Sequence, residues 1–197
     1  YIEKGNYQAQ IAFLEGPITR IFSTKSDAKK IAWIHNDISK VFGKSVKATI
    51  KRILDRNIYE KYDTLAFVSV DNLDKFNKVY DDMDLPHETV IHNYINAERI
   101  LELSKQDEEA KKTFNSRELN LVQVSRLVEQ KAVDRLIDVH TKLIKQGYKH
   151  HIYVIGDGPL REKLMKQIKE NKVEDTFTIL GAKKNPYQFM KNADAVC

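Results

Sequence analysis

Short apolar runs alternate with amphipathic segments along most of the 197 residues, and this alternation constrains the fold more than any other feature. The runs typical of buried strands are 9–14, 29–35, 64–70, 89–95, 119–125, 151–156, 176–181 and 193–197. Between them, apolar residues recur at helical spacing, as over 44–59, 131–146, 159–171 and 185–192. Strands that alternate with helices in this way form parallel sheets with right-handed crossovers. The sequence therefore predicts an α/β fold.

One segment interrupts the alternation. Residues 96–118 are charged and poor in large apolar side chains, which is typical of a solvated helix, a linker or a domain boundary. We therefore expect two open α/β sheets, over 1–95 and 114–197, joined by a connector at 96–113. Both sheets look truncated, because no helix follows the last strand-like run and no βα unit precedes the first. We expect the chain to continue beyond both ends.

Charge and composition exclude several classes of protein. The net charge of +5 permits binding to phosphates or to an anionic membrane surface and requires neither. No apolar run reaches the roughly 20 residues that span a bilayer. The single cysteine, Cys197, excludes a disulfide framework within these residues. Nucleic-acid binding is not expected, because there is no helix-turn-helix, zinc-finger or ribonucleoprotein pattern.

Three loops of the second half are expected at one edge of a sheet. Ligands of open α/β sheets gather at the carboxyl ends of the strands, beside the helix N-termini. The first loop holds Ser125, Arg126 and Lys131, the second is Gly156-Asp157-Gly158-Pro159, and the third follows Gly181 and holds Lys183, Lys184 and Asn185. These loops are the candidate binding site.

The turn at 156–159 is suited to an anion but does not require one. Its glycines permit positive φ or a close backbone approach, and Pro159 fits the first turn of a helix. The free amides of a helix start favour negative charge. A tight strand-to-helix turn without any ligand explains the same residues about equally well.

Arg126 and Lys131 favour an anion site over a turn without a ligand. A guanidinium fork suits phosphate oxygens, and a lysine adds a mobile positive charge. Solvated surface charges are the alternative, since 33 residues are Lys or Arg. Two cations beside a helix N-terminus repel each other and the helix dipole, so a diphosphate that joins them is the better explanation.

Histidines and basic residues elsewhere allow further interpretations. His35 ends a strand and is a proton donor, a substrate contact or a packed histidine, with the last favoured from the residue alone. His150 and His151 begin a strand and look structural. No set of His, Asp and Cys has the spacing of metal ligands, so we expect no metal and no cofactor. The helix at 44–58 carries basic residues for which a solvated face is favoured over contact with anionic lipid: Lys44, Lys47, Lys51, Arg52 and Arg56.

Three stretches in order, VSRLVEQKAVDRLIDVHTKL, HIYVIGDGPLREKL and TFTILGAKKNPYQFMKNADAV, carry a family resemblance. They resemble the C-terminal domain of retaining glycosyltransferases of the GT-B fold, glycosyltransferase family 4. KKIAWIHND, AFVSVDNLDKF and TVIHNYIN are similar to the acceptor-side domain of bacterial members that build cell-surface or capsular polysaccharide. The resemblance implies two Rossmann-like parallel-sheet domains and a transferase that moves a hexose from a nucleotide-diphosphate sugar, UDP- or GDP-linked, to a glycan or lipid-linked acceptor.

The resemblance also implies roles for individual residues. Arg126 and Lys131 would bind the diphosphate, and His35 would reach toward the transferred sugar. The nucleotide pocket would be formed by Ser125, Gly156, Asp157 and Gly158 together with the backbone at Lys183. Members keep the anomeric configuration, need no metal, and often work on lipid-linked acceptors at the cytoplasmic membrane face, so we expect a cytoplasmic or peripheral protein.

This sequence departs from the family pattern in several places. Ser125 and Ala132 stand where the family usually has glycine, and Tyr94-Ile95-Asn96 stands where it usually has Gly-Ile-Asp. The family's glutamate-rich motif would follow Cys197 and its glycine-rich loop would precede Tyr1, so we expect these residues alone to bind nucleotide at best. A nucleotide-sugar 2-epimerase and a non-catalytic nucleotide-binding module remain as alternatives. A dinucleotide oxidoreductase is the weakest, because no G-x-G-x-x-G follows a strand.

Overall fold

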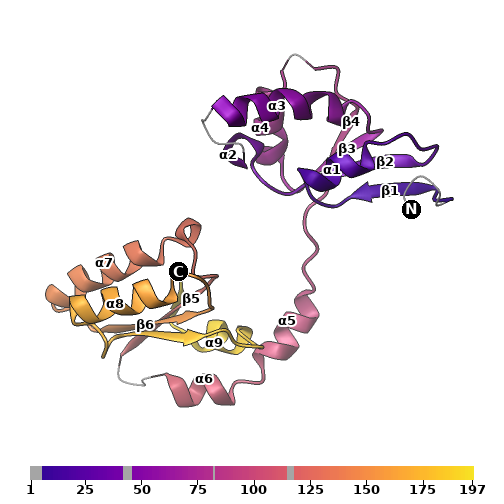
Figure 1. Cartoon of the computed structure of the whole chain (residues 1–197). Coiled ribbons are helices and arrows are strands. Elements are labelled where there is room, and N and C mark those ends of the chain that lie inside the picture. The colour runs from indigo at the N-terminus through magenta and orange to yellow at the C-terminus, as the bar shows by residue number, and fades with distance from the viewer. Residues whose placement is uncertain (1–5, 42–45, 82, 115–117) are drawn as a thin grey trace. The chain divides into compact units, whose positions relative to one another are not determined.

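A computed structural model describes residues 6–41, 46–81, 83–114 and 118–197 of the chain (Figure 1). The chain divides into two compact units, Tyr1–Ile95 and Asn96–Cys197. Each unit is an α/β layer structure built on its own four-stranded parallel sheet, as the alternation of apolar runs predicts.

The first unit has the strand order β1-β2-β3-β4, and every pairing is parallel. Its strands are β1 (Ala9–Ala12), β2 (Lys29–Ile34), β3 (Thr64–Phe67) and β4 (His87–Val90). The crossovers contain α1 (Pro17–Phe22), α2 (Ile38–Val41), α3 (Val46–Tyr59) and α4 (Val70–Val79). Because successive strands are neighbours, the loops that follow β1, β2 and β3 lie in sequence along the carboxyl edge of the sheet.

One face of the first sheet carries the core of this unit. Alternate residues such as Ala12, Ile34 and Phe67 are fully buried there, against aromatic rings from α3 and α4 that include Tyr59 and Phe76. The opposite face is more open: Ile11 is 46% exposed, and Phe13, the residue after β1, is 55% exposed. The period of two in burial is what a strand requires when only one of its faces is densely covered.

The second unit has the strand order β7-β6-β5-β8, again all parallel. Its strands are β5 (Leu119–Val124), β6 (His150–Ile155), β7 (Phe177–Gly181) and β8 (Ala195–Val196). Its helices are α5 (Ala97–Ser104), α6 (Glu108–Thr113), α7 (Val133–Lys145), α8 (Arg161–Asn171) and α9 (Tyr187–Asn192), with a short 3₁₀ turn over Glu129–Lys131.

Helices cover both faces of this second sheet (Figure 1). Ile152 and Val154 point to the face packed by α7 and α8, with Ile137 and Leu164 in the same core. Tyr153 and Ile155 point to the other face, where residues of α6 and α9 such as Ala110 and Phe189 are fully buried. Burial on both faces explains why the run HIYVI is continuously apolar after its first histidine.

The structure corrects several expectations about individual elements. Ser69 caps α4 and accepts a hydrogen bond from the amide of Asn72. The helices α1 and α2 were not predicted, because each is short and offers little apolar periodicity. The expected strand over 89–95 pairs only as far as Val90.

The segment expected as a connector is folded. It forms α5 and α6, and both helices pack against α9, so residues 96–113 are part of the second unit. Its low content of large apolar residues is explained by short helices that each bury only a few side chains, such as Ser104 and Ala110.

His140 and His150 form a buried pair at the start of β6. Nδ1 of His140 lies 2.9 Å from Nε2 of His150, and Nε2 of His140 lies 2.9 Å from Oγ1 of Thr176. Burial lowers the pKa of His140 to about 4, and the neighbouring His150 and His151 act in the same direction. The His140 imidazole is therefore neutral near pH 7, and both buried rings lie at the amino ends of the strands, away from the candidate loops.

Candidate functional site

The three candidate loops of the second unit lie around one cavity of about 390 Å³ at the carboxyl ends of β5, β6 and β7. Ser125 and Arg126 contribute from the first loop, Gly156 and Asp157 from the second, and Lys183 from the third. Strand order explains this convergence, because β5, β6 and β7 are consecutive neighbours in a parallel sheet. A ligand in this cavity contacts all three loops.

Backbone hydrogen bonds hold the loops together beyond the ends of the strands. The amide of Ser125 donates to the carbonyl of Ile155 at 3.0 Å, and the amide of Leu127 donates to the carbonyl of Asp157 at 3.0 Å. The amide of Gly156 donates to the carbonyl of Gly181 at 2.9 Å. The floor of the cavity is therefore continuous with the sheet.

The glycines of the second loop are required by the neighbouring loop. Gly156 has a φ of 149°, and a Cβ built on it would lie 1.8 Å from the carbonyl oxygen of Ser125. A Cβ on Gly158 would lie 2.5 Å from the carbonyl oxygen of Leu127. Both contacts are far shorter than any van der Waals approach, so the close backbone approach expected at this motif is made to the protein itself.

Of the two cations expected at the cavity, Arg126 lines it and is exposed. Lys131 is exposed in the 3₁₀ turn and is not among the residues that line the cavity. The ammonium of Lys183 lies 2.7 Å from Oε1 of Glu109 in α6, so this charge is engaged by a helix of the same unit. Arg126 therefore differs from both lysines: unlike Lys131 it lines the cavity, and unlike Lys183 it has no described ion-pair partner.

The two positions where the family pattern expects glycine have different structural roles. Ala132 adopts the left-handed conformation, with φ 50° and ψ 36°, at the start of α7, which explains why glycine is suited to this position. Ser125 follows the last residue of β5 and lines the cavity; its Oγ is buried and has no hydrogen-bond partner among the described residues. Ser125 is among the residues expected at this site, and the structure adds that its hydroxyl is buried without a described partner.

In the first unit, His35 lies at the carboxyl end of β2 beside two aromatic rings. Its ring centroid is 4.6 Å from that of Phe13 and 6.0 Å from that of Trp33. Its Nε2 is buried and lacks a hydrogen-bond partner within the described part of the chain. His35 therefore packs against aromatic rings, as expected for a packed histidine, while its Nε2 has no hydrogen-bond partner among the described residues.

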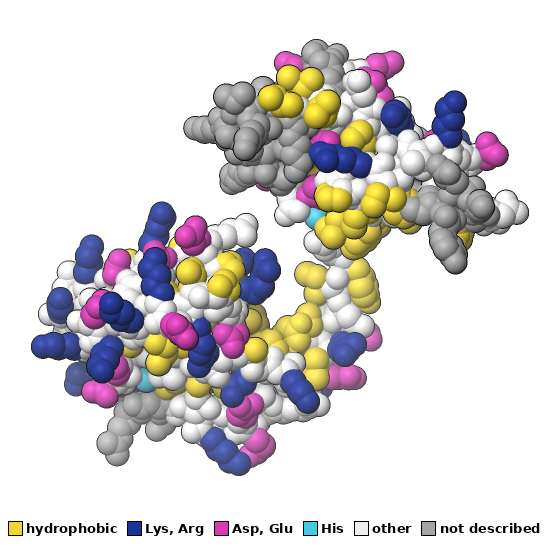
Figure 2. All heavy atoms as spheres, in the orientation of Figure 1, with side chains coloured by type: hydrophobic (Ala, Val, Ile, Leu, Met, Phe, Trp, Pro, Cys, Tyr) yellow, Lys and Arg dark blue, Asp and Glu magenta, His cyan; other side chains and the backbone are white. Residues whose placement is uncertain are grey.

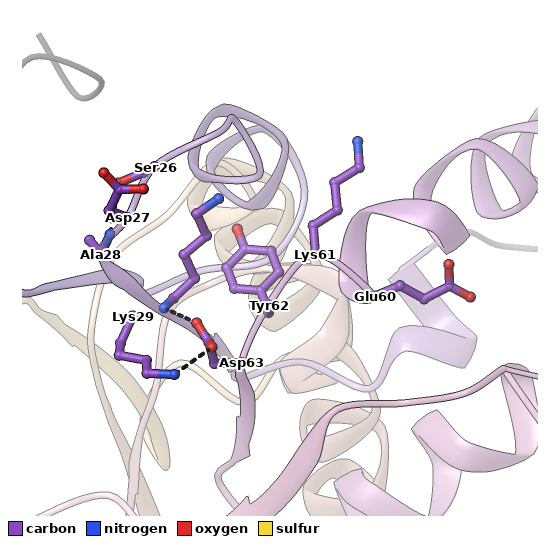
Figure 3. Close-up of a pocket in the computed structure, with 9 residues that line it drawn as sticks. Ser26, Asp27, Ala28, Lys29, Glu60, Lys61, Tyr62 and Asp63 are labelled. Carbon is purple, nitrogen blue, oxygen red and sulfur yellow. Dashed lines mark hydrogen bonds and ion pairs between the residues drawn. The ribbon is translucent and has the colours of Figure 1, made fainter.

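A further cavity of the first unit, of about 340 Å³, lies at the amino ends of β2 and β3 (Figure 3). Asp63 accepts a hydrogen bond from the amide of Lys30 at 2.7 Å, and its carboxylate lies 3.1 Å from Nζ of Lys29. The hydrogen bond from the Lys30 amide, helped by Lys29, lowers the pKa of Asp63. Asp63 is thus bound by the neighbouring Lys29 and Lys30. The cavity lies at the amino edge of the sheet, whereas open α/β folds bind their ligands at the carboxyl edge.

The described residues contain no group of three or more His, Cys, Asp or Glu side chains placed to hold a metal ion.

Comparison with protein families gives a match over the second unit. Residues 104–197 match the family described as Glycosyl transferases group 1. Solved structures resemble most of the chain: TarM from S. aureus has a TM-score of 0.67 at 20% identity, covering 90% of this chain and 33% of its own. Anabaena HepE in complex with UDP-glucose has a TM-score of 0.66 at 18% identity, covering 86% and 46%. The chain has the fold of GT-B glycosyltransferases.

Curated relatives of this GT-B chain are similar over nearly its full length. A glycosyltransferase of uncharacterised function from Methanocaldococcus jannaschii is 21% identical over 90% of this chain and 44% of its own. N-acetylgalactosamine-N,N'-diacetylbacillosaminyl-diphospho-undecaprenol 4-alpha-N-acetylgalactosaminyltransferase from Campylobacter jejuni is 24% identical over 98% of this chain and 48% of its own. The chain spans about half the length of these relatives.

The packing of Gly156 against Ser125 gives a prediction. Gly156→Ala places a methyl group on a carbonyl oxygen, so the loops must separate, and we expect a loss of about 3 kcal/mol or more in the free energy of unfolding. The matched control is Gly147→Ala: Gly147 also has a positive φ, 90°, but an added Cβ meets nothing within 4 Å. We expect the control to lose only about 1 kcal/mol. Denaturant unfolding measures both, and equal losses would show that the loops are not in contact.

Proposed function

We propose that the protein containing this chain is a glycosyltransferase that moves a sugar from a nucleotide-diphosphate sugar to an acceptor hydroxyl. The observation that carries the proposal is the convergence of three loops, with Arg126 among them, on one cavity inside the segment that matches Glycosyl transferases group 1. The cavity of about 390 Å³ is within the size range of small-molecule sites. Donor binding is assigned to this cavity.

The donor contacts follow from the chemistry of the loops. Arg126 offers a guanidinium fork to the diphosphate, and the unpaired hydroxyl of Ser125 donates a further hydrogen bond. Lys131, outside the lining but exposed on the same loop, adds a second cation when its side chain extends. Gly156 and Asp157 form the nucleotide wall, and Gly158, which is not among the lining residues, supports it by packing against the carbonyl of Leu127. The backbone at Lys183 meets the base, while its ammonium stays with Glu109.

Catalysis in this proposal is electrostatic. Negative charge grows on the diphosphate as its bond to the anomeric carbon breaks, and Arg126 and Lys131 stabilise that charge. The acceptor hydroxyl attacks from the face that the diphosphate leaves and gives its proton to the departing diphosphate oxygen, so the anomeric configuration is retained, as in glycosyltransferase family 4. Because two cations neutralise the leaving group, the proposal requires no metal. We assign to His35 the role that the family resemblance implies, a contact to the transferred sugar.

Relatives support an acceptor in surface polysaccharide synthesis. The C. jejuni relative is named for a sugar carried on diphospho-undecaprenol. A second relative, the amylovoran biosynthesis glycosyltransferase AmsD from Erwinia amylovora, is 26% identical over 42% of this chain and 23% of its own. We infer a hexosyltransferase that acts on a glycan or lipid-linked acceptor in bacterial polysaccharide synthesis, including capsule, at the cytoplasmic side of the membrane.

Nucleotide binding tests the donor site in the 197-residue chain. We expect isothermal titration to show binding of UDP or GDP, and Arg126→Ala to weaken it about tenfold, since a hydrogen bond to a charged group contributes about 1.5–3 kcal/mol. Arg135→Ala, on the exposed side of α7, is the control and should bind as the wild type does. Binding that is absent, or unchanged in Arg126→Ala, would contradict the assignment.

Sugar transfer is tested with the whole protein that contains this chain. We expect product only when a nucleotide sugar and an acceptor are both present, and none from these 197 residues alone, because the chain spans about half of its relatives. Release of an epimerised sugar from the donor without acceptor would favour the 2-epimerase, and nucleotide binding without any product would favour a binding module.

We also propose that α3 contacts the membrane. Ile50, Ile53 and Leu54 are 54%, 62% and 67% exposed, and Figure 2 shows hydrophobic side chains on the outer surface where α3 lies in Figure 1. The basic side chains expected to accompany them lie outside the described residues: Lys44, Lys47, Lys51, Arg52 and Arg56. Among the helices that the structure describes, none is long and apolar enough to cross a bilayer, so the proposed contact is peripheral.

Vesicle flotation tests this contact. We expect the chain to float with vesicles rich in anionic phosphatidylglycerol and much less with neutral phosphatidylcholine. Leu54→Ser should weaken the partition about tenfold, because burying a leucine contributes about 1.5–3 kcal/mol. The control is Val139→Ser on α7, where Val139 is 51% exposed. If both variants float as well as the wild type does, α3 is a solvated helix.

A further inference from the structure

Glu15 connects two loops at the carboxyl edge of the first sheet. It lies in the loop that follows β1, and its carboxylate accepts hydrogen bonds from the amides of His35 at 3.2 Å and of Asn36 at 2.9 Å. The side-chain amide of Asn36 donates to the same carboxylate oxygen. One carboxylate thus binds both amides of the turn in which the β2 chain leaves the sheet.

This arrangement is more than a surface contact. Glu15 is only partly exposed, and the two amides it binds belong to the residues that directly follow Ile34, the last residue of β2. Hydrogen bonds from amides to an ionised carboxylate are stronger than those to a neutral acceptor. A neutral glutamine at this position keeps the length of the side chain but loses the charge and one of the two acceptor oxygens.

The same turn is held on its other side by α4. The side-chain amide of Asn72 donates to the carbonyl of Ile34 at 3.2 Å, and Nζ of Lys75 lies 3.3 Å from the carboxylate of Asp37. A hydrogen bond from Ser39, together with Lys75, lowers the pKa of Asp37. The backbone around His35 is therefore fixed at Ile34 and at Asp37, and Glu15 supplies the bonds to the residues between them.

We propose that Glu15 is a positioning residue that sets the imidazole of His35. Its carboxylate fixes the backbone of His35, the rings of Phe13 and Trp33 restrict the side chain, and Nε2 is left unsatisfied for a sugar hydroxyl. The sequence gives no direct signal of this role, because Glu15 lies twenty positions before His35. The part of the inference that concerns transfer rests on the proposed function, whereas the control of the turn does not.

Hydrogen exchange tests the control of the turn in the 197-residue chain. In Glu15→Gln, we expect the amides of His35 and Asn36 to exchange about tenfold faster, while the amides of β2 stay protected, because loss of these bonds opens the turn and not the sheet. The control is Glu60→Gln, an exposed glutamate at the opposite edge of the unit, which should leave both rates unchanged. Unchanged exchange in Glu15→Gln would overturn the proposal.

Kinetics of the whole protein test the link to His35. We expect Glu15→Gln to lower kcat by about 10- to 100-fold with little change in the donor KM, since small misplacements of a reacting group have effects of this size. In a His35→Ala background, the same substitution should lower kcat no further. Additive losses would show that Glu15 acts independently of His35. Absence of transfer by the wild type would contradict the proposed function, while the exchange rates would still report on Glu15.

Discussion

The contact between the Ser125 carbonyl and Gly156 is the constraint on which the cavity of the second unit depends. Where β5 and β6 end, their chains stay in register through amide–carbonyl bonds, and the second chain can approach this closely only without a Cβ. The third loop joins through the amide of Gly156 and the carbonyl of Gly181. Because these bonds use the backbone of the loops, Arg126 and Ser125 keep their side chains available for a ligand.

In both units, polar contacts between neighbouring loops fix the backbone at the carboxyl edge of the sheet, but the side chains presented there differ. In each, parallel strands bring successive loops to one edge, and short polar contacts across neighbouring loops fix them. In the second unit these contacts are backbone bonds that glycines permit, and the residue presented to the cavity is a cation. In the first unit the contact is the carboxylate of Glu15, and the residue presented is a histidine among aromatic rings. Rigid backbone under a few reactive side chains is what binding and catalysis require.

The sequence predicted the layers and the convergence of the loops because both follow from local periodicity and from the geometry of parallel sheets. It did not predict α1 or α2, whose few residues carry too little pattern, or the packing of α5 and α6, which depends on contacts with α9. The sequence predicts a close backbone approach at Gly156 but not its partner, the carbonyl of Ser125 in the neighbouring loop, because that contact depends on tertiary structure. Likewise, the ion pair of Lys183 with Glu109 and the bonds of Glu15 join residues far apart in the chain.

The most direct test of the central claim is to map where UDP binds. Titration of the ¹⁵N-labelled 197-residue chain with UDP, followed by amide chemical shifts, reports every loop at once. The account predicts that the largest changes fall in the three loops of the second unit, at 125–127, 156–158 and 181–183. Changes centred on the other cavity, at 28–30 and 61–63, or the absence of changes in the three loops at saturating UDP, would contradict it.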